Sequence, residues 1–425
     1  SAQRAMTHPL PAYQRAEILS RAAHLVEQRL EDFARTIALE AGKPIKTARL
    51  EVMRAVATLT FSAIEARTLA GEVVPMSGAA AGAGKIAFTL REPIGVVGAI
   101  TPFNFPLNLV CHKVGPAIAA GCAVVLKPAS ATPITALKLA EVLMEADLPR
   151  GWLNVIPGPS GEVGNTLVDH PDVPLISFTG SVEVGRAIRE RAPHKKVLLE
   201  LGNSSPLIVF EDAELESAAQ AVATHGFSHA GQSCISVQRV LVQETVAEPF
   251  EQLVVEKVQQ LGVGDPLDEK THVGPLITTA DRDRVKAWID EAVSAGARLL
   301  LGGEVEGTLL MPTVLADVTP DMKVFYTEVF GPVVGMTRFR TLEEAVELAN
   351  ATEYGLQAGV FTASISTALE MAKRLRFGGV LINEAPTYRT DQMPYGGVKA
   401  SGNTREGPHY AVREMTVEKL VVMQT

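Results

Sequence analysis

Cysteine is scarce in this sequence, with 3 residues in 425. A disulfide framework needs more cysteines than this, so a reducing compartment such as the cytoplasm is expected. The chain also has no excess of positive charge, because its formal net charge is -9. A broad electrostatic grip on nucleic acid or anionic lipid would need a basic face, and neither is expected as a partner.

Long apolar runs are missing as well. The longest stretch without Asp, Glu, Lys or Arg runs from Pro93 to His112. Pro102 and Pro106 interrupt it, and the polar Asn104 would sit unpaired in lipid, so a buried strand followed by a turn is expected there instead of a membrane helix. No charged segment followed by an apolar run opens the chain, and we therefore expect no signal peptide.

The apolar residues that are present form two series of short runs. A helical pattern covers residues 14–69, and a Gly/Ala-rich turn follows at 77–84. The first series then comprises residues 95–100, 122–126, 153–156, 175–178 and 197–199, and the second comprises 206–210, 240–242, 333–339 and 358–361. Helix-like segments lie between the runs, which is typical of parallel sheets covered on both faces. We expect an α/β fold, with a Thr/Val-rich terminal strand at 415–423.

Cys234 differs from the other two cysteines because its neighbours are small and polar, in Ala-Gly-Gln-Ser-Cys-Ile-Ser. Small neighbours let a substrate approach the sulfur, but the pattern alone leaves a nucleophile and a packing residue both open. Cys111 and Cys122 lie among apolar residues, where cysteine is usually inert. His225 and His229 lie four residues apart on a predicted helix, but they lack the adjacent Glu and third ligand of a zinc site, so no metal is expected.

Three further segments could carry chemistry. Residues 178–185, Phe-Thr-Gly-Ser-Val-Glu-Val-Gly, join a strand to a helix whose N-terminal amides would attract a phosphate, although a plain turn explains them equally well. Lys127 ends a strand at the sheet edge where open α/β folds bind ligands, or else lies in a solvated loop. Glu200 also ends an apolar strand, where burial would raise its pKa and suit a general base, unless the carboxylate is paired.

The motifs gain weight from their joint occurrence and order. They are Pro102-Phe103-Asn104-Phe105-Pro106, Lys127-Pro128, Phe178-Thr179-Gly180-Ser181, Glu200-Leu201-Gly202, Gly231-Gln232-Ser233-Cys234, Glu328-Val329-Phe330-Gly331-Pro332 and Pro394-Tyr395-Gly396-Gly397-Val398-Lys399. Together they resemble the aldehyde dehydrogenase superfamily over almost the whole chain from about Gln14.

The resemblance implies a catalytic set. Cys234 would be the nucleophile that attacks an aldehyde carbonyl, and the Asn104 side-chain amide would stabilise the oxyanion together with the Cys234 backbone N–H. Hydride would pass to a nicotinamide ring, and Glu200 would activate the water that hydrolyses the thioester. Lys113 matches a family lysine in the proton path.

The resemblance also implies NADP or NAD as cofactor. Lys127 would contact the adenosine ribose, Ser181 the pyrophosphate and Glu328 the nicotinamide ribose. Many relatives carry a glutamate three residues past the lysine that repels a 2′-phosphate; Ser130 removes that repulsion, so NADP should be accepted, alone or with NAD. The other implied cofactor contacts are Thr101, Pro102, Phe103, Asn104, Ala129, Phe178, Thr179, Gly180, Val184, Leu201, Gly202 and Phe330.

The substrate contacts are implied by the same resemblance. His112 stands where relatives that oxidise apolar aldehydes carry an aromatic residue, and Arg389 lies in the loop that borders the substrate. Arginine suits an oxyanion, so a small polar or anionic aldehyde is expected, such as a semialdehyde or hydroxyaldehyde. Alternatively, Arg389 only pins its loop to an acidic neighbour. The other substrate contacts that the resemblance implies are Phe105, Ser233 and Ile235.

The implied architecture has a Rossmann-like cofactor domain (1–74 and 94–202), an α/β catalytic domain (203–400) and a bridging element (75–93 and 401–425). The exposed terminal strand of that element predicts a homodimer or homotetramer. Two other functions stay open: a thiol hydrolase that pairs Cys234 with His225 or His229 and needs no nucleotide, and a non-catalytic relative.

Overall fold

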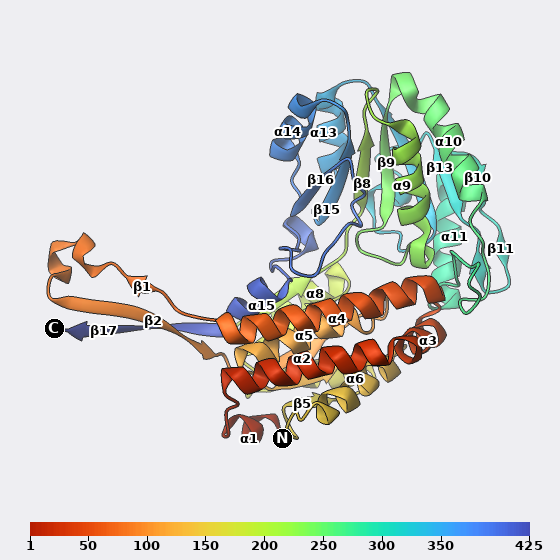
Figure 1. Ribbon diagram of the computed structural model, residues 1–425. Coiled ribbons are helices and arrows are strands. Elements are labelled where there is room, and N and C mark those ends of the chain that lie inside the picture. Colours follow the sequence, from red (N-terminus) through yellow and green to blue (C-terminus); the bar gives the residue numbers. More distant parts are fainter.

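Four helices begin the chain in this computed structural model, which describes residues 1–425 (Figure 1). They are α1 (Ala2–Met6), α2 (Ala12–Gln28), α3 (Leu30–Ala41) and α4 (Ile45–Thr68). Apolar side chains of α2, α3 and α4 recur at three- and four-residue spacings and enter one buried cluster, as in Leu19, Ala23 and Val26. The helical pattern predicted at 14–69 is confirmed.

The first sheet has five parallel strands in the order β5-β4-β3-β6-β7. They are β3 (Val97–Ile100), β4 (Val124–Lys127), β5 (Leu153–Val155), β6 (Leu175–Thr179) and β7 (Lys196–Glu200). Each overlaps one of the apolar runs of the first series. The last residues of β4, β6 and β7 are Lys127, Thr179 and Glu200. Because the strands are parallel, these residues lie at the same edge of the sheet, as does Thr101, which follows β3.

Helices cover this sheet: α5 (Asn108–Ala120), α6 (Pro133–Glu145), α7 (Asn165–Asp169) and α8 (Val182–Arg191). The strand expected within residues 93–112 is present as β3, but the turn after it leads into α5, which the sequence analysis did not predict. The cause is a contact from another element. The Glu51 carboxylate on α4 accepts the backbone N–H groups of Leu107, at 2.9 Å, and Asn108, at 3.1 Å, and so caps the first turn of α5.

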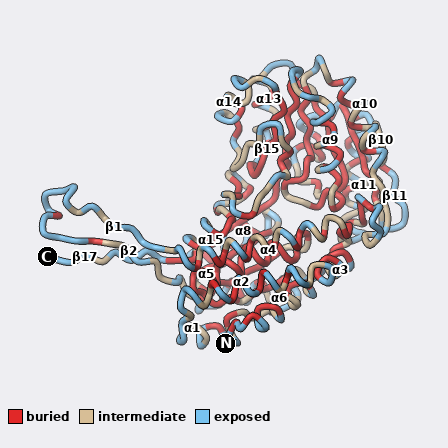
Figure 2. The backbone as a smooth tube through the Cα atoms, viewed as in Figure 1, coloured by how far each residue is buried: buried red, intermediate tan, exposed pale blue.

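The second sheet has seven strands in the order β10-β13-β14-β9-β8-β15-β16, all parallel except β10. They are β8 (Ser205–Val209), β9 (Val237–Gln243), β10 (Arg298–Leu301), β13 (Thr313–Ala316), β14 (Val333–Phe339), β15 (Gln357–Phe361) and β16 (Gly379–Ile382). Helices α9 (Leu215–Phe227), α10 (Ala247–Gln259), α11 (Thr279–Ser294), α13 (Leu342–Asn350) and α14 (Ile365–Arg374) lie around it. Its central strands are buried along their length (Figure 2), as their unbroken apolar runs predict.

A long arm projects from the first sheet and its helices (Figure 1). In it, β2 (Lys85–Pro93) pairs antiparallel with β17 (Thr416–Gln424), and the short β1 (Val73–Val74) pairs with the other side of β2. The terminal strand expected at 415–423 is confirmed, and the arm is largely exposed (Figure 2).

None of the helices combines the length and apolar composition that a bilayer crossing requires. The domain limits given above stay predictions.

Candidate active site

One narrow cavity of about 30 Å³ gathers side chains from the first sheet, from helices α4 and α5, and from loops that lead into and follow the second sheet. Glu200 comes from the end of β7, and Cys234 from the loop between α9 and β9. Arg389, Tyr395 and Glu406 come from the long segment after β16. The cavity therefore lies where the first sheet, the second sheet and the C-terminal segment meet.

The loop that carries Cys234 approaches a second loop very closely. Gly231 has a φ of +68°, and a Cβ on it would lie 2.0 Å from the Gly331 carbonyl oxygen. Only glycine fits this position, because any side chain would both strain the backbone and overlap the neighbouring chain. The close approach fixes the Glu328–Gly331 segment beside Cys234. The thiol of Cys234 is 3.1 Å from the Tyr395 hydroxyl, and burial raises the pKa of Cys234 to about 12.

Asn104 lies in the loop between β3 and α5, next to the Cys234 loop. Its side-chain Nδ2 donates to the Gln232 carbonyl at 3.0 Å. Its Oδ1 is buried and has no hydrogen-bond partner. The Asn104 amide group thus contacts the loop that carries Cys234, at a carbonyl two positions before the cysteine.

The pKa values of two buried carboxyls are shifted in opposite directions. Burial raises the pKa of Glu200 well above its ordinary value, Glu406 raises it further, and Glu200 Oε1 has no hydrogen-bond partner. Burial also opposes ionisation of Glu406, but Lys113 at 3.4 Å and Arg389 at 3.0 Å outweigh it and lower the pKa of Glu406 to about 2. Lys113 also donates to Ser177, at 3.2 Å. One carboxyl is thus available to take up a proton, and the other is held as an anion.

A hydrogen-bonded network of charged side chains connects Glu406 with helix α4. Arg389 Nη2 contacts both Glu406 Oε2 and His112 Nε2, each at 3.0 Å. His112 Nε2 in turn contacts Asp391 at 3.0 Å, and Arg54 of α4 pairs with Asp391 at 2.9 Å. Burial, together with the Arg389 charge, lowers the pKa of His112. Arg389 is therefore paired with an acidic neighbour, as the alternative interpretation held, while its Nε is buried and unpartnered.

Several members of this network were not predicted from the sequence. Arg54 lines the cavity from the middle of α4, and no motif marks it. Asp391 lies two residues past Arg389, and Glu406 follows Arg405 in a segment whose partners are distant in sequence. Tyr395 belongs to a motif quoted for the family resemblance, but nothing in the sequence singled out its hydroxyl.

The predicted cofactor residues lie along the carboxyl edge of the first sheet. Lys127 Nζ is 2.9 Å from Ser160 Oγ and 3.4 Å from Ser130 Oγ, and Ser130 donates to the Gly158 carbonyl at 2.8 Å. Ser181 caps α8 by accepting the Val184 N–H at 3.4 Å. Pro102, Phe103 and Ala129 lie in the loops after β3 and β4, Phe178 and Thr179 end β6, and Leu201 follows β7.

Glu328 and its surroundings form a cradle with features suited to a ribose. Glu328 Oε1 accepts the Asn203 N–H at 3.0 Å, and burial raises the pKa of Glu328 to about 7. A Cβ on Gly202 would lie 2.5 Å from Glu328 Oε2. Any larger residue at position 202 would therefore collide with this carboxylate. The Phe330 ring meets the Phe103 ring edge to face at 5.9 Å, and Thr101 Oγ1 is buried without a partner. A helix N-terminus, a lysine and unpartnered polar atoms fit a dinucleotide.

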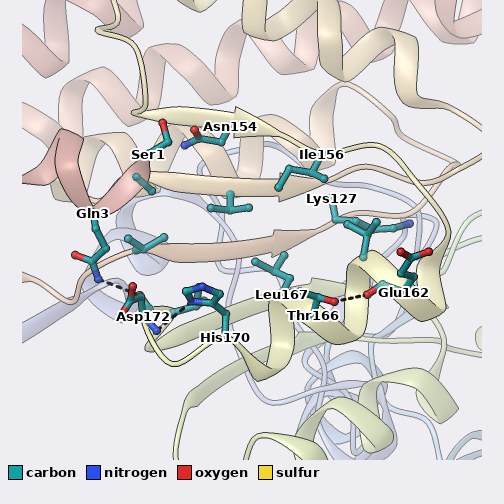
Figure 3. Close-up of a pocket in the computed structure, with 15 residues that line it drawn as sticks. Ser1, Gln3, Lys127, Asn154, Ile156, Glu162, Thr166, Leu167, His170 and Asp172 are labelled. Carbon is teal, nitrogen blue, oxygen red and sulfur yellow. Dashed lines mark hydrogen bonds between the residues drawn. The ribbon is translucent and has the colours of Figure 1, made fainter.

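A second, larger cavity of about 570 Å³ lies beside Lys127 (Figure 3). It runs between β4, β5 and α7 toward the first residues of the chain, with Ile156, Thr166 and Leu167 on its walls. Of the predicted cofactor residues it contains Lys127 alone, and it contains none of the candidate catalytic residues. Size therefore does not identify the reacting site here.

The two histidines of α9 and its following turn do not activate the cysteine. Both ring nitrogens of His229 are buried without a partner, and burial lowers its pKa well below the ordinary value. The hydrogen-bond partner of Cys234 Sγ is Tyr395. No group of three or more His, Cys, Asp or Glu side chains is arranged to hold a metal ion.

Comparison with known proteins establishes the family of this chain. The aldehyde dehydrogenase family model matches residues 1–421. The 3-sulfolactaldehyde dehydrogenase of Priestia megaterium is 48% identical over 423 residues, which cover 100% of this chain and 89% of the relative. The lactaldehyde dehydrogenase of Methanocaldococcus jannaschii is 43% identical over 418 residues, covering 97% and 89%.

Two solved structures share the whole fold. Glyceraldehyde-3-phosphate dehydrogenase GapN from Methanocaldococcus jannaschii, complexed with NADP, matches with a TM-score of 0.95 and 42% identity over 100% of this chain and 92% of that one. Aldehyde dehydrogenase 21 from Physcomitrella patens, in complex with the product succinate, matches with a TM-score of 0.96 and 39% identity over 100% and 88%. The chain belongs to the aldehyde dehydrogenase family. It is an NAD(P)-dependent aldehyde dehydrogenase, and the thiol-hydrolase alternative is not supported.

Proposed function

We propose that Cys234, Asn104 and Glu200 are the reacting groups of this aldehyde dehydrogenase, and that its substrate is a small anionic hydroxyaldehyde. The observation that carries the proposal is the convergence of Cys234 and Glu200 on one cavity that Arg54 and Arg389 also line. Asn104 lies at the same loop through its bond to Gln232.

The residues divide the reaction as follows. The Cys234 thiolate attacks the aldehyde carbon, a C–S bond forms, and the carbonyl π pair moves to the oxygen. The Asn104 amide and the Cys234 N–H donate to that oxyanion, and each such donor is worth about 2.7–4 kcal/mol. NADP or NAD, when bound, supplies the hydride acceptor. Glu200 then takes a proton from the water that adds to the thioester carbon, and the thiolate leaves as the acid forms.

Lys113 and Glu406 adjust the proton acceptor. They form a buried pair beside Glu200, and the Glu406 charge raises the pKa of Glu200. Raising the pKa of this carboxyl makes it a stronger base once it is ionised. Lys113, which lowers the pKa of Glu200, limits that effect and keeps the carboxyl within reach of ionisation.

Lys127, Ser130 and Ser160 support the use of NADP. Their amino and hydroxyl groups form one cluster at the end of β4. The family resemblance implies that the adenosine ribose binds there. A lysine with two hydroxyls suits a 2′-phosphate, and there is no carboxylate at position 130 to repel it. We propose that NADP is used in preference to NAD, and that Ser181 and Glu328 hold the pyrophosphate and the nicotinamide ribose.

The charge of the network supports an anionic substrate. Arg54, Lys113 and Arg389 contribute three positive charges against the two negative charges of Asp391 and Glu406, and the lowered pKa of His112 keeps that ring neutral. One positive charge is therefore uncompensated as long as Glu200 is protonated, and the buried Arg389 Nε is a donor with no hydrogen-bond partner, which suits an oxyanion. Relatives named for sulfolactaldehyde and lactaldehyde agree with a three-carbon hydroxyaldehyde. We propose a sulfonate or carboxylate on its third carbon.

The test compares 3-sulfolactaldehyde with uncharged lactaldehyde in a coupled assay of NADPH formation. Cys234→Ala should abolish NADPH formation with both. Arg54→Met should lower kcat/KM for the anionic aldehyde by roughly 30-fold and for lactaldehyde by less than about threefold, because it removes a charge-assisted contact worth about 2 kcal/mol. Arg67→Met, an exposed arginine on the same helix, is the matched control. Equal losses for both aldehydes in Arg54→Met would exclude Arg54 from the anion site.

We also propose that the enzyme is a cytoplasmic homodimer or homotetramer assembled through the β2–β17 arm. The outer edge of β17 is free to pair over 9 residues, and apolar side chains remain exposed on the arm. We also propose the three predicted domains. They are the cofactor domain (1–74 with 94–202), the catalytic domain (203–400) and the bridging element (75–93 with 401–425).

A further inference from the structure

The contact between Tyr395 and Cys234 has no part in the mechanism above. The phenol oxygen lies 3.1 Å from the thiol sulfur, and either atom can donate while the sulfur is protonated. Once the sulfur is ionised it can only accept, so the phenol must be the donor. A hydrogen bond to a charged acceptor is roughly twice as strong as a neutral one, so the contact favours the thiolate over the thiol.

Tyr395 is held firmly in this position. Its side chain is buried and packs with Ile235 and Leu356. Its backbone forms two hydrogen bonds with that of Glu406. The Glu406 N–H donates to the Tyr395 carbonyl at 2.6 Å, and the Tyr395 N–H donates to the Glu406 carbonyl at 3.2 Å. The Arg389 guanidinium lies 3.7 Å above the ring centre. A cation over the ring withdraws electron density from the phenol and makes its O–H a better donor.

The other groups that face the sulfur mostly oppose its ionisation. Burial and the carboxylates of Glu328 and Glu200 raise the pKa of Cys234, while Tyr395 and Arg389 lower it. Tyr395 is thus the hydrogen-bond donor that this chain supplies to the sulfur before an aldehyde arrives.

We propose that Tyr395 is a further catalytic residue, whose hydroxyl donates to the Cys234 sulfur and stabilises the thiolate nucleophile. This rests on the proposed role of Cys234. When the sulfur attacks, the C–S bond forms and the negative charge moves to the carbonyl oxygen, so the Tyr395 hydrogen bond weakens as the bond from Asn104 strengthens. Tyr395 therefore increases the fraction of thiolate but slightly reduces the reactivity of each thiolate.

These two effects predict a pH dependence that a packing role would not produce. Tyr395→Phe keeps the ring, its packing and the Arg389 contact, and removes only the donor. Alkylation of Cys234 by iodoacetamide, followed by mass spectrometry of the Cys234 peptide, should be about tenfold slower in Tyr395→Phe at pH 7.5. The rates should converge only as the pH passes the raised pKa of Cys234, about 12, since the thiolate then forms without help. The kcat/KM for aldehyde oxidation should show the same trend.

Tyr388→Phe is the matched control, because Tyr388 is exposed in the same segment and should change neither rate. Identical alkylation rates in wild type and Tyr395→Phe would overturn the proposal, and so would a loss that does not shrink once the pH passes the pKa of Cys234. If Tyr395→Phe does not fold, wild-type enzyme with its 6 tyrosines replaced by 3,5-difluorotyrosine serves instead. Its more acidic phenol should speed alkylation at pH 7.5, and an unchanged rate would overturn the proposal.

The same preparations separate this inference from the proposed function. Aldehyde-dependent NADPH formation by wild type, and its loss in Cys234→Ala, tests the nucleophile without reference to Tyr395. If that activity is present and Tyr395→Phe matches wild type at all pH values, the inference about Tyr395 fails alone. If Cys234→Ala stays active, the proposed function fails first.

Discussion

Glu200 is the residue whose ionisation should set the lower pH limit of turnover. A protonated Glu200 cannot accept a proton from water, and burial with the Glu406 charge raises its pKa well above the ordinary value. Thioester hydrolysis should therefore be lost as the pH falls through that raised pKa, and kcat should increase with pH through a midpoint higher than that of a solvent-exposed glutamate. A kcat–pH profile measures this.

Removing the carboxylate tests the same assignment. Glu200→Gln should lower steady-state kcat by about 10²–10⁴-fold and remove the acid limb of the profile. The first turnover, which needs Cys234 and Asn104, should persist as a burst of NADPH in stopped-flow absorbance. Glu190→Gln, on the exposed face of α8, should behave like wild type. A burst that is lost along with steady turnover would show that Glu200 acts before the thioester.

Ser130 should govern the choice between the two dinucleotides. Ser130→Glu places a carboxylate beside Lys127, whose amino group lies 3.4 Å from the Ser130 hydroxyl. Repulsion of the 2′-phosphate should raise KM for NADP by about tenfold or more, while KM for NAD falls or stays constant. Ser130→Ala, which adds no charge, is the control. The role of position 130 would be refuted if both variants changed KM for the two dinucleotides by the same factor.

At the residue scale, the sequence predicts reacting groups better than it predicts their surroundings. Cys234, Asn104 and Glu200 each belong to a short contiguous motif, and the structure brings Cys234 and Glu200 to one cavity. Arg54, Asp391 and Tyr395 act through contacts between segments distant in the chain, such as Arg54 with Asp391. No local pattern encodes such contacts, and so these three residues could not be predicted from the sequence.

At the scale of elements, α5 depends on a carboxylate from another helix. Glu51 caps the first turn of α5 through the N–H groups of Leu107 and Asn108, and it forms a buried ion pair with Lys43. Glu51→Ala leaves these donors and the Lys43 charge unpaired. The free energy of unfolding should fall by about 3–5 kcal/mol, measured by urea denaturation.

The same substitution should also affect the site. The Asn104 loop leads directly into α5, and Lys43 lies 3.7 Å from the centre of the Phe105 ring. Glu51→Ala should therefore lower kcat as well as stability, whereas Glu141→Ala, at an exposed position on α6, should change neither. Unchanged stability in Glu51→Ala would show that water replaces the cap.

The elements that the sequence predicts well are those with local signals. The β14 bounds agree with the predicted apolar strand at 333–339, and α9 is one of the helices expected between the runs of the second series. The strands β2, β13 and β16 were missed as separate strands. β2 has mixed burial and is paired with β17, which lies at the far end of the chain. Its identity as a strand is decided by that partner more than by its own residues.

At the scale of the whole molecule, the arm gives the last test. Ile86 and Leu90 of β2 alternate onto one face of the β2–β17 pair with Val417 and Met423 of β17, and all four are 43–51% exposed. We expect a second subunit to cover this face, since exposed apolar strands pair or aggregate. Leu90→Glu would bury a charge in that contact and should reduce the mass measured by light scattering to that of a monomer. Ile365→Glu replaces an even more exposed apolar residue, on α14, with the same charge and should leave the mass unchanged. Equal masses for Leu90→Glu and wild type would exclude this face from the subunit contact.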